Sequence, residues 1–462
     1  MSRSLRSLLR GGETAADPRV MTREQSQALT DRTIKLSRAE GIQVNVGGGY
    51  TANIRFADNR ISTAGGVSTA ALNIQSSFGP KHAVVSTNDF SDAGLERAVR
   101  QSEALAKLAP DDPESMPLLG QQEYENVNSY FDATGNLGPE GRAAAARIAI
   151  DACKAAGDLK AAGYIVTGIG ANAVGNNKGL FAYQSGTSAN YTLTVRTVDG
   201  TGSGWAGADH PDWSQLDVKA VAQRAIDKAR LSKNPAAVEP GRYTVILEPQ
   251  AVGDLVQLLA FALDARSADE GRSAFSKQGG GTKVGDKIVD ERVTLYTDPA
   301  DPQLLSNSFD GQGLAAHRVA WIENGVLKRL TYSRFWAQKK NQPPDAGTNA
   351  VKLAGGTQSI DDLIKSTPRG ILVTRLWYLR PVDPRTVLYT GLTRDGTFLI
   401  ENGKVSKAVK NMRFNESPLF MLNNLEGLGR AERVAGTEAG GDVVMPALKV
   451  RDFNFTSLSD AV

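Results

Sequence analysis

The stretch "IQVNVGGGYTANIRFADNRISTAGG", Ile42–Gly66, decides the fold of the first part of this chain. Apolar and polar residues alternate along it, with Gly and Asn between extended arms, and similar stretches follow at 67–79 and 81–88. A period of two puts successive side chains on opposite faces of a strand, so the pattern predicts an antiparallel sheet. A helix is predicted before it at 22–41. A second helix is predicted after Ser91 as N-cap, with one apolar face made of Leu95, Ala98, Val99 and Leu105.

Two polar, proline-containing segments, Ala109–Pro117 and Lys233–Gly241, interrupt these patterns and predict linkers. Between them, a helix is predicted from Pro139, which suits the first helical position, and another at 216–232. Beyond the second linker, a strand at 242–248 and an apolar helix lead into a mostly β region.

That β region contains Asn324-Gly325 and Asn402-Gly403, each between extended arms. Asn-Gly favours a type I′ hairpin turn, because both central positions need positive φ. The predicted fold class is α+β: an N-terminal α/β half with two subdomains, then a C-terminal curled antiparallel β-sheet or partial barrel. The predicted segments are a disordered extension, an N-terminal domain, a middle domain and a C-terminal domain, at 1–20, 21–116, 117–236 and 240–462.

Bulk composition narrows the class of protein. The chain has 462 residues, is 41% hydrophobic and 22% charged, and is typical of a globular protein. Its 53 basic and 50 acidic residues are scattered, which argues against a nucleic-acid partner. No apolar run reaches the roughly 20 residues of a membrane span. The single Cys153 cannot form an internal disulfide, lies among apolar residues and predicts an inert core thiol in a cytoplasmic protein.

The sequence contains few candidates for catalytic or metal-binding residues. The histidines His82, His210 and His317 lie far apart and lack metal-ligand partners at local spacing, so they are predicted to be surface or loop residues. Of these, only His210 sits in a polar cluster, with Asp209 and Asp212, for which loop capping is predicted. A serine-hydrolase elbow of the G-x-S-x-G type is missing from the sequence.

Two glycine-rich stretches, Gly168–Gly175 and Gly200–Gly207, each follow a strand, as a dinucleotide-binding loop would. Neither leads into a helix or has an acidic ribose partner at the expected distance. Flexible turns are therefore the predicted role of both stretches.

Four further stretches carry a resemblance when taken together. They are "RFADNRISTAGGV", "EGRSAFS", "RVAWIENGVLKRL" and "DPRTVLYTGLTRDGTFLIENGKV". In this order they resemble the TldD/PmbA family, whose members were first named as modulators of DNA gyrase and are now regarded as peptidases. The resemblance covers nearly the whole chain after Met21.

In the TldD branch of that family, a His-Glu-x-x-x-His helix supplies two zinc ligands and a general base, and a Gly-Thr-Cys segment supplies a third ligand. Aligned on Ser273–Phe275, this chain places Val256 and Phe261 at the histidine positions and Gln257 at the glutamate position. Glu438 replaces the cysteine. Val and Phe cannot ligate zinc, and Gln cannot accept a proton at neutral pH, so no catalytic residue and no metal are predicted for this chain.

The resemblance implies a PmbA (TldE)-like, non-catalytic subunit of a TldD-type zinc peptidase complex. Such a complex cleaves unfolded or small peptides, and the zinc is expected in the TldD-like partner. The helix itself, apolar almost all round, is predicted to be a buried core helix through Leu255, Val256, Leu258, Leu259, Phe261 and Leu263. Substrate or partner binding is predicted for the loop residues Asp264, Arg266, Asp269 and Glu270.

Two alternatives from other classes stay open. One is a metal-independent hydrolase that acts alone. The other is a homodimeric binding protein without enzymatic activity, and a homodimer is also an expectation for the isolated chain.

Overall fold

The computed structural model describes residues 19–347, 350–437 and 440–459. In its N-terminal half, the described residues form a six-stranded antiparallel sheet in the order β3-β2-β1-β4-β5-β6. The opening stretch of the sequence is the β1–β2 hairpin, as predicted. The strand bounds are β1 Gly41–Ala57, β2 Arg60–Phe78, β3 Lys81–Thr87, β4 Leu159–Asn176, β5 Phe181–Thr197 and β6 Ser203–His210.

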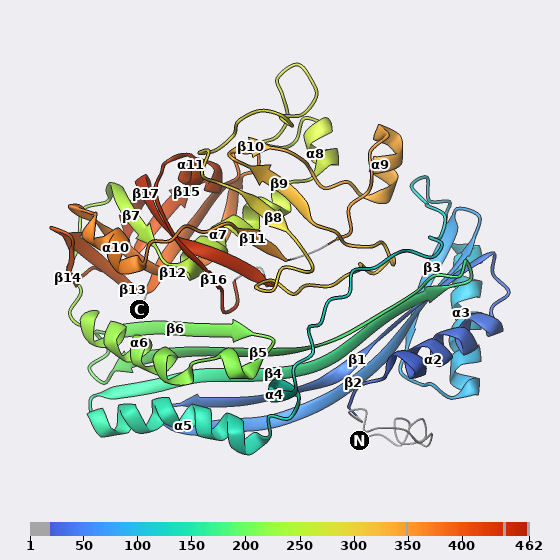
Figure 1. The fold of residues 1–462 in the computed structure, drawn as a ribbon, viewed down its shortest axis with the longest axis horizontal. Helices are drawn as coiled ribbons and strands as arrows, with labels where there is room; N and C mark the ends of the chain where they lie inside the picture. The colour runs from blue at the N-terminus through green and yellow to red at the C-terminus, as the bar shows by residue number, and fades with distance from the viewer. Residues whose placement is uncertain (1–18, 348–349, 438–439, 460–462) are drawn as a thin grey trace.

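Helices pack on this sheet, with α2 and α3 at one end, α5 and α6 at the other and the short α4 between them (Figure 1). They are α2 Arg23–Leu36, α3 Asp92–Leu108, α4 Asp132–Gly135, α5 Pro139–Ala156, the short 3₁₀ helix η1 Trp213–Gln215, and α6 Val218–Leu231. Ser91 caps α3 as predicted, and its Oγ accepts a hydrogen bond from Gly94 N at 3.1 Å. The prediction for Leu105 was wrong, because it is 45% exposed. Leu105 lies ten residues after Leu95, and at 3.6 residues per turn this spacing places its side chain away from the buried face of α3.

The C-terminal half is a curled, eleven-stranded sheet within the described residues. Strands β17, β15, β13, β12 and β7 pair in sequence and β7 pairs with β17 again, which closes a small barrel. The strands are β7 Gly241–Leu247, β8 Leu295–Thr297, β9 Val319–Glu323, β10 Val326–Leu327, β11 Val351–Leu353, β12 Arg369–Asp383, β13 Leu388–Glu401, β14 Lys404–Ala408, β15 Met412–Glu416, β16 Leu425–Arg433 and β17 Val443–Leu458. The helices are α7 Pro249–Ala262, α8 Ala265–Asp269, α9 Arg334–Lys340, α10 Ile360–Lys365 and α11 Pro418–Asn423.

The fold class is therefore the predicted one in its main lines, with one correction. The C-terminal sheet is mixed, not antiparallel, because β7 pairs with β12 and β11 pairs with β17 in parallel. The connection from β7 to β12 is long and runs through α7 and every element up to α10, and a parallel pair requires such a crossover in place of a hairpin. Both Asn-Gly turns are confirmed: φ is positive at Asn324 and Gly325 and at Asn402 and Gly403.

The prediction of flexible turns at the two glycine-rich stretches was wrong for most of their length. Gly168–Gly175 lies inside β4, and the second stretch enters β6 at Ser203. In β6 the small residues allow close packing: a Cβ on Gly204 would lie 2.3 Å from Ala229 N and 2.4 Å from Ala225 O of α6. Glycine is used here to bring helix α6 onto the sheet, not to bend the chain.

The two predicted N-terminal domains share one sheet, since β1 pairs with β4 along Gln43–Phe56. The predicted domain boundaries stay predictions. Of the predicted disordered extension, residues 1–18 lie outside the described residues. Val20 is buried and packs with Ile169 and Ala171, so the extension does not continue to residue 20.

In the described part of the chain, each helix is too short or too polar to cross a lipid bilayer. Cys153 is fully buried, and burial raises the pKa of its thiol to about 11, which agrees with the predicted inert core residue.

Candidate functional site

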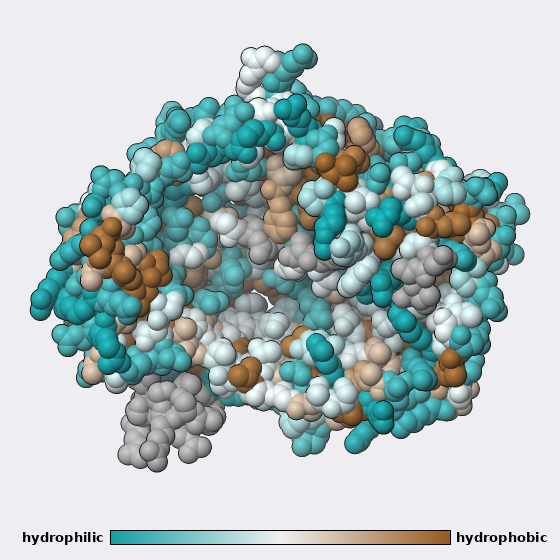
Figure 2. Space-filling model, turned by 180° about the vertical axis from the view of Figure 1, so that it is seen from behind, coloured by the Kyte–Doolittle hydropathy of each residue, from teal (hydrophilic) through white to brown (hydrophobic). Residues whose placement is uncertain are grey.

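A cleft of about 490 Å³ lies between the first sheet and the C-terminal barrel. Figure 2 shows the molecule hollowed between these two bodies. One wall is the outer edge of β6, Trp205–His210, and the helix α6 behind it. The other wall is the start of α7 and the end of β16 with the residues that follow, Ala431–Ala435.

The edge of β6 that faces away from β5 is partly covered by side chains of α6 and its C-cap. The Ser232 hydroxyl accepts from Ser203 N and donates to Ser203 O, both at 2.8 Å. Lys228 Nζ donates to Trp205 O at 3.4 Å, and Arg224 donates to Gly207 O at 3.3 Å. These two contacts are longer than the Ser232 contacts with Ser203, so the β6 edge beside the cleft is covered less closely than its start.

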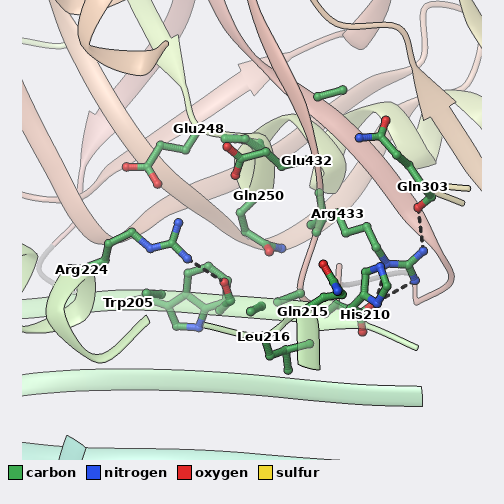
Figure 3. A pocket seen from close by; sticks show the side chains of 18 of the residues that line it. Trp205, His210, Gln215, Leu216, Arg224, Glu248, Gln250, Gln303, Glu432 and Arg433 are labelled. Carbon is green, nitrogen blue, oxygen red and sulfur yellow. Dashed lines mark hydrogen bonds and ion pairs between the residues drawn. The ribbon is translucent and has the colours of Figure 1, made fainter. Parts of the chain in front are cut away.

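The cleft is lined by charges of both signs. Lys228 Nζ and a Glu248 carboxylate oxygen lie 2.6 Å apart on its floor. Arg433 joins the two walls, since its guanidinium donates to Asp209 of β6 at 2.8 Å and to the Gln303 carbonyl at 2.9 Å. Figure 3 shows Glu248, Gln303 and Arg433 among the side chains that line the cleft. A ligand with both hydrogen-bond donors and acceptors, such as a peptide, complements this mixture of positive and negative side chains better than an anion would.

Gln250, in the first turn of α7, has an unusual amide. Its Nε2 donates to Gly436 O at 3.0 Å, while its Oε1 is buried and has no hydrogen-bond partner among the described residues. In Figure 3 the amide points between Arg224 and Arg433. A buried acceptor without a partner costs about 1–3 kcal/mol, so a donor from a bound ligand at this point would be favourable.

His210 lies at the end of β6 and lines the cleft. Its Nδ1 accepts a hydrogen bond from Asp212 N at 2.9 Å, and Asp212 in turn caps η1 through Ser214 N, so the predicted loop-capping role is confirmed for these two residues. For Asp209 the prediction was wrong, because Asp209 lies in β6 and its carboxylate pairs with Arg433. Burial lowers the pKa of His210, and the nearby Arg433 guanidinium lowers it further. Both effects favour the neutral imidazole.

We expect an NMR titration of His210 to give a midpoint below its ordinary value of 6.5. The folded state disfavours the imidazolium, so the stability from this group is present above pH 6.5 and is lost as pH falls through the lowered pKa. Arg433→Gln should raise the midpoint, since it removes a neighbouring positive charge. A midpoint at or above 6.5 in the unaltered chain would contradict the electrostatics described here.

Comparison with known proteins identifies the chain. Residues 240–457 match the PmbA/TldA metallopeptidase C-terminal domain, and residues 136–233 match the central domain of the same proteins. This chain belongs to the PmbA/TldD family. The fold is that of TldE from Thermococcus kodakarensis, with a TM-score of 0.82 and 20% identity over 93% of this chain and 99% of that one.

Several curated relatives of this PmbA/TldD protein are named as proteases. A metalloprotease of Methanothermobacter thermautotrophicus is 26% identical over 46% of this chain and 48% of its own length. A zinc metalloprotease TldD homolog of Saccharolobus solfataricus is 22% identical over 46% of this chain and 49% of its own length. The alignments thus span about half the length of these relatives.

The three family zinc-motif positions on α7 lie in different surroundings. Val256 is fully buried in the main hydrophobic core. Gln257 is also buried, and its amide accepts from Thr437 Oγ1 and donates to Gly440 O. Phe261 is 48% exposed, which corrects its predicted place in the core. It lies in the last turn of α7, whereas the buried residues of the helix end at Leu259.

These residues do not fit the zinc of the TldD branch. One position is enclosed by hydrocarbon, one holds an amide that is already hydrogen-bonded at both ends, and one is aromatic. Within the described ranges, no three His, Cys, Asp or Glu side chains come together as a metal-binding group. Glu438, at the position of the family cysteine, lies outside the described residues.

The predicted binding residues of α8 gather elsewhere and have internal partners. Asp264 caps α8 through Ser267 N at 2.7 Å. Arg266 pairs with Glu114 at 2.9 Å and with Glu270 at 3.0 Å. Asp269 accepts from Trp336 Nε1 at 2.7 Å. None of the four predicted residues is among those that line the cleft, and a binding role for them stays a prediction.

The cleft residues escaped the sequence analysis, apart from the polar cluster around His210. They come from β6, α6, the β7–α7 junction and β16, and the first and last of these elements are more than two hundred residues apart in the chain. A weak signal was present: Glu248-Pro249-Gln250 puts polar side chains at the point where a buried strand becomes a buried helix.

Proposed function

We propose that this chain is the non-catalytic, PmbA (TldE)-like subunit of a peptidase complex whose zinc is held by a TldD-like subunit, in the cytoplasm. One observation carries the proposal: the Gln257 amide, at the family's general-base position, is bound to Thr437 and Gly440 of the segment that would supply a metal ligand. An amide held in this way positions a loop and does not activate water.

The work proposed for this chain is to hold peptide in the cleft. The backbone edge of β6 runs along one wall, and an extended peptide can add to such an edge as a further strand. Gln250 would then accept from a peptide N–H, and the Glu248 and Arg433 side chains would contact polar groups of the substrate. Unfolded or small peptides fit, because a folded domain cannot offer an extended strand to a cleft of about 490 Å³.

The test begins with the tagged full-length chain, purified gently from its source. We expect a TldD-like subunit to co-purify, the complex to cleave unfolded peptides with a chelator-sensitive activity, and the chain alone to be inactive. Chelator-resistant cleavage by the chain alone would instead establish the metal-independent hydrolase. A chain that binds no TldD-like subunit, with no activity in either form, would establish the binding-protein alternative.

A variant in the cleft separates a substrate-holding role from a structural one. Gln250→Ala in the reconstituted complex should raise KM about fivefold to tenfold, since one hydrogen bond is worth about 1 kcal/mol, and leave kcat nearly unchanged. Ala220→Ser, on the solvent side of α6, is the control and should change neither constant. Unchanged KM for Gln250→Ala would overturn the cleft as the peptide site.

A further inference from the structure

Two charged side chains of the cleft have no partner of opposite charge. Most of the charged side chains that line the cleft form ion pairs across it, as described above. The exceptions are Arg224 of α6 and Glu432 of β16. Among the described residues, the Arg224 guanidinium donates only to the Gly207 carbonyl, and the Glu432 carboxylate has no hydrogen-bond or ion-pair partner. A ligand with one negative and one positive group would complete the charge pairing of the cleft.

The positions of these two side chains suit the two ends of one ligand. Arg224 belongs to the wall formed by β6 and α6, Glu432 belongs to the opposite wall, and both are exposed. Figure 3 shows Arg224, Glu432 and the Gln250 amide around the same space. Exposed charges alone do not define a binding site, because water can solvate them.

The amide of Gln250 is independent evidence for a ligand that carries a donor group. Gln250 is only 8% exposed, and its Oε1 has no hydrogen-bond partner among the described residues. Its Nε2 donates to Asp254 Oδ1 at 3.3 Å and to Gly436 O at 3.0 Å. Because both of these neighbours are acceptors, the NH₂ end of the amide must face them, and the oxygen is the end left without a partner. A buried acceptor held in this way favours a ligand that brings an N–H group.

We propose that the cleft binds a short peptide by its two free ends, with the terminal carboxylate at Arg224 and the terminal ammonium at Glu432 and Gln250 Oε1. This inference rests on the proposed peptide-holding function and names the class of peptide. A guanidinium can hold a carboxylate through two parallel hydrogen bonds, and an ammonium has three N–H groups, enough for both acceptors. A cleft of about 490 Å³ is in the size range of small-ligand sites, so both ends of one peptide lie inside it only if the peptide is short.

Peptides with blocked ends test each contact separately. The purified full-length chain is titrated in a calorimeter, at pH 7 and low salt, with free alanine and with alanine peptides from dialanine to hexaalanine, whose two ends are charged at this pH. We expect one peptide length to bind most tightly, since the fold fixes the distance between Arg224 and Glu432. For that length, N-acetylation and C-amidation should each raise Kd about tenfold, because each removes a charge-assisted contact.

Neutral variants connect each end of the peptide to its residue. Arg224→Gln should raise the Kd of the free peptide about tenfold and leave that of the amidated peptide unchanged, since the amidated peptide no longer makes the contact that the variant removes. Glu432→Gln should act in the same way on the free amino end and leave the acetylated peptide unaffected. Glu426→Gln is the matched control, because Glu426 is exposed on β16 and does not line the cleft. It should change none of these Kd values.

The possible failures are distinguishable. Equal Kd values for free and blocked peptides, or variants that weaken both kinds to the same extent, would overturn end recognition and leave the cleft as a peptide site. Tightest binding by free alanine would exclude the peptide and assign the cleft to a single amino acid. A chain that binds none of these ligands, alone or in the reconstituted complex, would overturn the proposed function together with this inference.

Discussion

Val256→His should lower the free energy of unfolding by about 3 kcal/mol or more. Val256 is fully buried in the main core, where α7 packs against β17 and β12. The imidazole is larger than the isopropyl group and brings ring nitrogens into hydrocarbon; overpacking costs about 1–3 kcal/mol and a buried polar group without a partner a similar amount. Urea denaturation monitored by circular dichroism measures the loss.

Phe261→His is the matched control on the same helix. Because Phe261 is 48% exposed, its replacement should cost less than about 1 kcal/mol. Equal losses for the two variants would show that Val256 is not held in the core as described. The expected difference means that a zinc site cannot be rebuilt on α7 by exchanging side chains, since one ligand position has become part of the core.

Gly204→Ala should be the most damaging glycine substitution in β6, with a loss of about 3 kcal/mol. The added Cβ would lie 2.3 Å from Ala229 N and 2.4 Å from Ala225 O. Both are backbone atoms of α6 and cannot rotate away, so the helix must move off the sheet. Since α6 carries Arg224 and Lys228, ligand binding in the cleft should weaken along with stability.

Gly47→Ala is the control, because Gly47 also lies in a strand and its nearest contact to a new Cβ is Asn172 Oδ1 at 3.5 Å. We expect Gly47→Ala to change stability by less than about 0.5 kcal/mol or to increase it slightly. Thermal denaturation of the two variants side by side gives the comparison. A Gly204→Ala variant as stable as Gly47→Ala would mean that α6 does not pack closely on β6.

Sequence patterns predicted the structure correctly where interactions between residues close together in the chain determine it. The alternation in Ile42–Gly66, the N-cap at Ser91, Pro139 at a helix start and both Asn-Gly turns were predicted correctly. Each depends on one residue's backbone preference or on side chains a few positions apart. The glycines of β4 and β6 were misread, because a glycine that permits a turn and one that admits a neighbouring helix are identical in sequence.

The sequence by itself predicted, through the resemblance, that Val256, Gln257 and Phe261 stand at the zinc-motif positions. Their inability to ligate zinc or take a proton follows from the sequence too, since it is a property of each side chain's own atoms. Only the tertiary structure decided that Val256 faces hydrocarbon, that the Gln257 amide hydrogen-bonds Thr437 and Gly440, and that β6, α6, α7 and β16 line a cleft. Contacts between distant segments follow from packing of the whole chain. The spacing of residues along the sequence therefore does not predict which strands and helices come together around the cleft.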